Sequence, residues 1–226
     1  MAYSDPGDLA SGAVITEAWV DAVRADILAS AVAIVTTKGD IVAATEANVI
    51  ARLGIGADDS TLVAASGEAT GIKWQIQPAC RLTQAADQSV GGAAFAALTF
   101  DTEVYDTDTM HSPTVEPTRI TCPDNGDGIY HIQGNIEFDN NGGTGAQELA
   151  IQILLNGATV LAEVYANANE DDANISLYVA TDYVLSDNGA GANDYVELLA
   201  YTEKNDNIKY ISAHTPVFSA RWVRMP

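Results

Sequence analysis

The spacing of apolar residues changes along the chain, and the first pattern is helical. Four apolar residues recur at every fourth place, namely Ile15, Trp19, Val23 and Ile27, and charged residues stand between them. Such a period gathers apolar side chains along one face of a helix. Thr16 followed by Glu17 is typical of a helix start. The pattern therefore predicts an amphipathic helix within residues 1–36.

The apolar face of this helix needs a partner, and two hypotheses remain open. The helix docks on its own globular domain, or it pairs with copies of itself or with the shell of a larger assembly. We favour the second hypothesis, because a Trp-bearing helix ahead of an Ala-, Gly- and Thr-rich stretch has no core of its own. Residues 1–36 are thus interpreted as an anchoring segment, and its predicted interaction residues are Ile15, Trp19, Val23 and Ile27.

Residues 37–78 consist of short β-prone pieces separated by glycines and an Asp-Asp-Ser turn. This composition predicts small hairpins, which are too short to be stable as isolated units. Gly54 and Gly56 lack the third glycine of a dinucleotide-binding loop, and no Lys-Ser or Lys-Thr follows a Gly-rich turn. We therefore expect a β-rich neck without a nucleotide site.

Residues 79–226 alternate with a period of two, which is the period of a half-buried strand. One face of the first long strand is apolar, with Tyr130, Ile132, Ile136 and Phe138, and the other is polar, with His131, Gln133, Asn135 and Glu137. Leu149, Ile151, Ile153 and Leu155 repeat the pattern before Asn156-Gly157, a strong hairpin signal. Further strands are expected around 158–166, 174–185, 194–203, 207–213 and 216–224. Many short strands with frequent turns predict an antiparallel sandwich.

The charge of the chain excludes some classes of partner. The 226 residues include 31 acidic and 10 basic side chains, a formal net charge of −21. This surface repels phosphates and anionic bilayers, so we expect neither nucleic acid nor membrane as a partner. No apolar run approaches the ~20 residues that span a bilayer. The first residues also lack the basic and apolar regions of a signal peptide.

The cysteines and histidines show no spacing that indicates chemistry. Cys80 and Cys122 lie far apart in sequence and are interpreted as two packed free thiols, with a bridge between neighbouring strands as the alternative. His111, His131 and His214 fall on separate predicted elements. We therefore predict for them neither a catalytic nor a metal-binding role.

Carboxylates are abundant enough to raise two chemical hypotheses. The pairs Asp101/Glu103 and Asp106/Asp108 have the residue types of a glycosidase, but they lie in one strand-to-turn segment, so we interpret them as structural. Two acidic loops contain oxygen ligands that calcium prefers, but neither has the spaced acidic pattern with a closing Glu. These loops contain Asp124, Asn125 and Asp127, and Glu170, Asp171, Asp172 and Asn174. The sequence thus predicts no catalytic residue, no metal and no cofactor.

Several runs together resemble a known domain. The run from Phe100 to His111 is followed by Thr118–Pro123 and by a strand at Gly128–Ile132. Asn193–Leu198 and Pro216–Val223 come later in the same order. This order resembles the complement-type (tumour-necrosis-factor-like) jelly-roll domain at the tips of phage fibres and decoration proteins. In addition, the stretch from Lys38-Gly39-Asp40 to Gly71-Ile72-Lys73-Trp74 resembles a recurring phage fibre segment that joins shaft to knob.

The resemblance implies a mainly β protein, with a C-terminal antiparallel jelly roll over 79–226, a short N-terminal helix and a β-rich neck. In that family the jelly roll has ten strands, its first and last strands are adjacent, and it forms homotrimers. We therefore predict a non-enzymatic phage virion structural protein on the virion surface, a head fibre or capsid decoration protein. Its N-terminal segment would bind capsid or tail proteins of the virion.

The short length favours a head fibre or decoration protein over a tail fibre, which usually needs a longer shaft. The alternative is a short tail fibre or minor tail protein that binds host surface glycans. A particle-borne glycan hydrolase is a remote third hypothesis.

Overall fold

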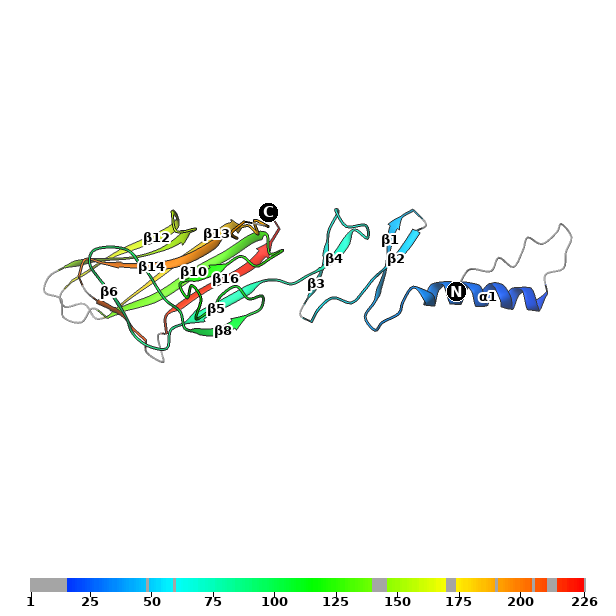
Figure 1. The fold of residues 1–226 in the computed structure, drawn as a ribbon, viewed down its shortest axis with the longest axis horizontal. Helices are drawn as coiled ribbons and strands as arrows, with labels where there is room; N and C mark the ends of the chain where they lie inside the picture. Colours follow the sequence, from blue (N-terminus) through cyan, green and yellow to red (C-terminus); the bar gives the residue numbers. More distant parts are fainter. Residues whose placement is uncertain are drawn as a thin grey trace. The chain divides into compact units, whose positions relative to one another are not determined.

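The chain forms two compact units, Met1–Ile76 and Gln77–Pro226, each of which is described by itself. The structure is a computed structural model, and Figure 1 shows its fold. It describes residues 16–47, 49–58, 60–139, 146–169, 174–189, 191–204, 206–210 and 215–225, without the side chains of 28–33.

The first unit contains one helix and two small antiparallel sheets. Helix α1 spans Glu17–Ala33, and the Thr16 hydroxyl accepts a hydrogen bond from the Trp19 N–H at its start, as the sequence predicts. One sheet pairs β1 (Ile41–Glu46) with β2 (Val49–Leu53), and the other pairs β3 (Thr61–Ala64) with β4 (Ile72–Gln75). Among the described residues, no helix is both long and apolar enough to cross a membrane.

The two small sheets are joined through the glycines that follow β2. The Trp74 Nε1–H on β4 donates to the Gly54 carbonyl at 2.7 Å. A Cβ on Gly56 would lie only 2.8 Å from the Trp74 ring atom Cδ2, so only glycine lets the indole lie against this backbone. This contact gives a physical reason for the spacing between the Gly-Ile-Gly run and Trp74.

Asp40 fixes the turn that leads into β1. Its side chain is 1% exposed, and it accepts hydrogen bonds from the N–H groups of Thr36 and Thr37 at 2.8 and 2.7 Å. Arg52 on β2 also donates to it, at 3.2 Å. Burial alone would raise the pKa of the Asp40 carboxyl, but these donors outweigh burial and hold the pKa below its usual value.

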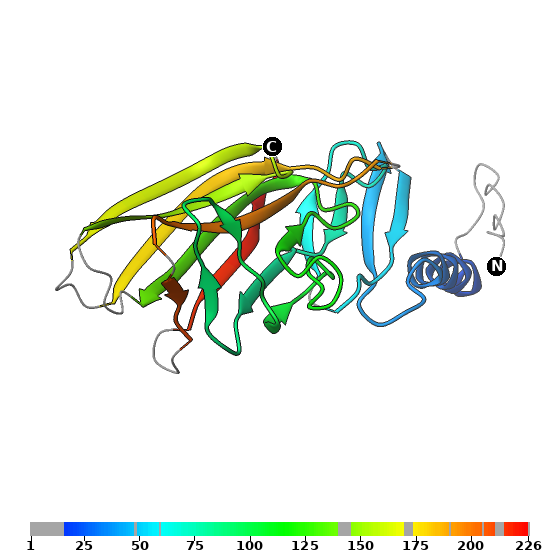
Figure 2. The same ribbon diagram turned by 60° about the vertical axis from the view of Figure 1, so that its left-hand side comes forward.

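The second unit is a sandwich of two antiparallel sheets (Figures 1 and 2). The first sheet has a row of five strands, in the order β13 (Ile175–Leu185), β10 (Gly128–Asp139), β16 (Val217–Arg224), β5 (Ala79–Thr83) and β8 (Thr102–Asp106). The short β15 (Asp206–Ile208) and β6 (Gln88–Val90) extend it beside the end of β10. The second sheet has the order β12 (Thr159–Ala168), β11 (Gln147–Leu155) and β14 (Tyr195–Thr202), with β7 (Ala96–Ala97) and β9 (Arg119–Thr121) on the far side of β14.

The order of the strands is that of a jelly roll. The chain passes from the first sheet to the second after β10, returns after β12, and crosses again after β13 and after β14. The first and last long strands, β5 and β16, are adjacent. These pairings confirm the predicted mainly β fold with a C-terminal antiparallel jelly roll and a short N-terminal helix.

The core lies between the two sheets, where the period-two pattern places it. Tyr130, Ile132, Ile136 and Phe138 of β10 are fully buried, as are Leu149, Ile151 and Ile153 of β11. Asn156 and Gly157 both adopt positive φ, at 51° and 68°, and connect β11 to β12 in the hairpin that the sequence predicts.

Three features differ from the expectation. Glu137 and Gln152 occupy polar positions in the pattern, but both are buried, at 6% exposure each. Glu137 is buried because its carboxylate accepts hydrogen bonds from Asn174 and Ser176 across the strand pair. Gln152 is buried because β11 is a central strand, on which Gln152 is flanked by Glu163 of β12 and Leu199 of β14. The strand expected at 207–213 is found as Asp206–Ile208 and ends before Lys209 and Tyr210, while 211–214 lie outside the described residues.

Candidate interaction surface

The predicted anchoring residues lie on α1, apart from Ile15, which is outside the described residues. Trp19 and Val23 are half-buried, whereas Ile27 is 64% exposed. None of the described strands packs along α1. Of the described members of this apolar stripe, Ile27 is thus the one that is largely exposed, and the anchoring role stays a prediction.

A second candidate surface is the solvent side of the first sheet, over its strands β13, β10, β16 and β5, which we call the outer face. It consists of positions of β13, β10, β16 and β5 that are aligned across the sheet, and most of those on β10 and β5 alternate with buried residues. The register sets these positions in rows across the sheet: Tyr178–Asn135–Val217–Thr83, Ala180–Gln133–Ser219–Arg81, Asp182–His131–Arg221–Ala79 and Val184–Ile129–Arg224.

The outer face is hollowed in two places. One hollow has a volume of about 700 Å³ and is lined by Arg81, Gln133, Asn135 and Tyr178, among others. The other has about 680 Å³ and is lined by Ile129, Asp182, Val184 and Arg224, among others. Exposed aromatic, aliphatic and guanidinium groups beside such hollows are typical of surfaces that bind another molecule.

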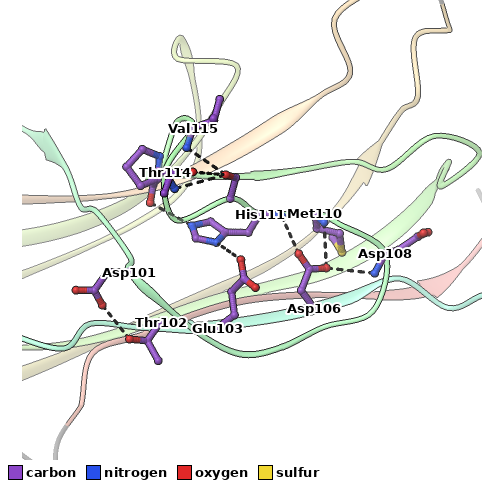
Figure 3. A network of polar contacts seen from close by, with 11 residues as sticks. Asp101, Thr102, Glu103, Asp106, Asp108, Met110, His111, Thr114 and Val115 are labelled. Atoms are coloured by element: carbon purple, nitrogen blue, oxygen red, sulfur yellow. Dashed lines mark hydrogen bonds and ion pairs between the residues drawn. The ribbon is translucent and has the colours of Figure 1, made fainter.

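Two of the four carboxylates that raised the glycosidase hypothesis, Asp101 and Asp106, accept main-chain hydrogen bonds (Figure 3). Asp106 accepts three main-chain hydrogen bonds, from the N–H groups of Asp108 and Met110 at 3.2 and 3.0 Å and of His111 at 2.9 Å. Asp101 accepts one from the Ala85 N–H at 2.8 Å. Such bonds fix a loop and leave these carboxylates committed to structure.

Glu103 and His111 make a separate contact in the same loop. The fully buried His111 ring has Nδ1 at 3.0 Å from the Glu103 carboxylate and Nε2 at 3.3 Å from the Pro117 carbonyl (Figure 3). Both neighbours are acceptors, and a neutral ring donates to only one of them. The arrangement ties β8 to the loop after it and engages both ring nitrogens of His111.

The other chemical candidates are also engaged in structure or lie outside the description. In the first acidic loop that was considered for calcium, the Asn125 N–H donates to Asp187, and Asp127 accepts from the Asp187 N–H. The described residues contain no group of three acidic, His or Cys side chains that could hold a metal. In the second acidic loop, 170–173 lie outside the described residues, as does His214.

Both cysteines are buried free thiols, which is the interpretation favoured from the sequence. Burial raises the pKa of Cys122 to about 12 and that of Cys80 further. Neither thiol is therefore a nucleophile at neutral pH, because the thiolate is the reactive form.

Comparison with solved structures gives weak likenesses. Murine APRIL at pH 5.0 has a TM-score of 0.47 and 14% identity, and murine APRIL at pH 8.5 has 0.45 and 13%, each covering 65% of this chain and 99% of that one. The globular domain of zebrafish complement 1qA protein has a TM-score of 0.40 and 14% identity, covering 66% of this chain and 99% of that one. No protein-family model and no curated protein matches the sequence. The jelly-roll assignment rests on the strand order itself, and these likenesses carry no argument about activity or partners.

The loop contacts predict that substitution of Asp106 lowers stability whereas substitution of the neighbouring Asp108 does not. Asp106→Ala leaves three main-chain donors without their acceptor, and we expect the free energy of unfolding of fragment 77–226 to fall by about 1.5–3 kcal/mol. Asp108 is the matched control, because burial and the charges of Asp106 and Asp124 raise the pKa of its carboxyl. Its ionised form is disfavoured in the folded state, so Asp108→Asn should cause no loss at pH 7. Urea unfolding measures both, and equal losses would contradict this assignment.

Proposed function

We propose that the chain is a non-enzymatic virion structural protein of a bacteriophage, which displays a trimeric jelly-roll knob as a head fibre or capsid decoration protein. The observation that carries this proposal is the distribution of the core. Every buried hydrophobic residue that the structure describes belongs to 77–226. The second unit can therefore fold alone, whereas the first unit needs a partner.

The physical reason is the small size of the elements in the first unit. An isolated helix of 17 residues is marginal in water, and so is an isolated two-stranded sheet. The unit nevertheless exposes apolar side chains on its helix and sheets, including Ile27, Val42, Ile50 and Ile55. A segment of this kind gains its stability by attachment, which is what an anchor on a capsid or tail protein does.

The knob supports display rather than catalysis. Asp106, His111 and His131 all make polar contacts within the fold. The hollow beside Tyr178 on the outer face is open to solvent. Exposed Tyr178 and Val184 on this face, at 51% and 39%, favour its burial against another copy. A closed ring of three copies is the arrangement that we propose for it.

One observation favours the second candidate, a short tail fibre or minor tail protein that binds host surface glycans. The hollow of about 700 Å³ sets the Tyr178 ring near the amides of Gln133 and Asn135. An aromatic platform with amide donors and acceptors suits a saccharide. Location decides between the two functions: many copies over the head indicate decoration, and a few copies at the tail indicate adhesion.

The oligomeric state of the knob tests the central part of the proposal. Fragment 77–226 holds the whole described core, so it should fold alone and sediment as a trimer at micromolar concentration. Analytical ultracentrifugation with circular dichroism as the check of folding measures this directly. A folded monomer at that concentration would refute the trimeric knob.

The anchor is tested through Trp19. If the apolar stripe of α1 binds the particle, Trp19→Ala in the full chain should leave the knob folded and trimeric but remove a contact worth about 3 kcal/mol. That loss corresponds to a retention on particles lower by about two orders of magnitude. The exposed Arg24→Ala is the matched control, since it lies on the same helix. Equal retention of wild type and Trp19→Ala would show that the stripe packs within its own chain.

A further inference from the structure

The basic residues of the knob are few, and half of them gather on the outer face. Residues 77–226 contain twenty-one acidic side chains and six basic ones. Three of the six, Arg81, Arg221 and Arg224, are exposed on the adjacent strands β5 and β16. Arg81 alternates with the buried Cys80 and Leu82, so it points away from the core. We call these three residues the arginine cluster.

The arginine cluster has no acidic partner among the residues that the structure describes. None of its three members makes an ion pair or a side-chain hydrogen bond with the described residues. Arg119 and Lys209 differ, because Arg119 pairs with Glu116 and Glu197, and Lys209 with Asp139.

The carboxylates of the outer face are already engaged. Asp182, in the row of Arg221, accepts a hydrogen bond at 2.7 Å from Nδ1 of His131, which lies between them. Glu137 is held by Asn174 and Ser176. The cluster is thus a positive patch on a knob whose sequence carries an excess of fifteen negative charges.

We propose that the arginine cluster binds an acidic surface of a second copy of this chain. The inference rests on the trimer proposed above and names the contact through which neighbouring copies would bind one another. Two knobs of strongly negative charge repel one another unless their contact joins opposite signs. The cluster supplies the positive side of such a contact, and any other knob supplies acidic groups in abundance.

Symmetry then favours a threefold ring over a twofold dimer. A twofold contact through this face would set the arginine cluster against itself, whereas a ring joins two different surfaces of neighbouring copies. The rest of the face suits a protein partner, because Arg and Tyr are enriched in interface cores. Exposed Tyr178 and Val223 surround the cluster, and Arg81 and Arg224 each line one of the two hollows that can receive side chains.

The test compares two full-length variants of equal net charge by analytical ultracentrifugation. The first is Arg81→Gln/Arg221→Gln/Arg224→Gln. The second, the matched control, is Arg24→Gln/Lys38→Gln/Lys73→Gln, which removes three positive charges outside the knob. We expect the first variant to keep its circular dichroism spectrum but to dissociate at least about tenfold more readily than wild type. The control should assemble like wild type.

Salt provides the second measurement. Raising NaCl from about 0.1 M to about 1 M shortens the Debye length from about 10 Å to about 3 Å, so wild-type trimers should weaken and the first variant should respond less. A wild-type trimer that the cluster variant and salt leave unchanged overturns this inference and leaves the proposed trimer standing. A wild-type monomer that binds polygalacturonate through the arginine cluster overturns both, and assigns the face to an acidic polysaccharide.

Discussion

The burial of apolar side chains between two sheets is the interaction on which the rest of this protein depends. The sandwich hides the alternate residues of β10 and β11 completely, including Tyr130 and Ile151. Burial of this kind is the main favourable term in folding. Only the second unit has such a core, so the two units differ in what they need from their surroundings. The first unit has specific contacts, such as Trp74 with Gly54, but these contacts orient elements without a core beneath them.

Charge adds a second constraint that acts between copies. A strongly acidic knob stays soluble, and the same charge opposes assembly. In the proposed assembly the pairing of β5 with β16 partly offsets this opposition, because it places Arg81 on the strand next to the one that carries Arg221 and Arg224. The jelly roll thus positions a positive patch from the two ends of the knob sequence on one sheet. The fold and the proposed assembly are linked through the adjacency of the first and last strands.

Much of the fold could be predicted because period-two alternation survives wherever one side of a strand is buried. The long strands and the Asn156-Gly157 hairpin follow from it. The short strands β6 and β7 were not predicted, since segments of three and two residues carry too little periodicity. The sequence pattern placed Glu137 on the exposed face. Its burial is explained only by the hydrogen bonds from Ser176 on β13 and from Asn174 just before β13.

The candidate site was harder to predict than the fold. The helical stripe around Trp19 is visible in sequence because its residues are neighbours on one element. The arginine cluster is not, because Arg81 and Arg221 are 140 positions apart and meet only through strand pairing. The structural role of Asp106 was also hidden, since three main-chain donors converge on it only in the folded loop.

The central claim is that the knob folds by itself whereas the first unit is ordered by assembly. Hydrogen exchange of the full-length protein, measured above and below the concentration at which it dissociates, tests this most directly. The account expects the amides of β10 and β11 to stay protected at both concentrations. It expects the amides of β1 to β4 to be protected only in the assembled sample. Equal protection of β1 to β4 in dissociated single chains would contradict it, because it would show that this unit is stable without a partner.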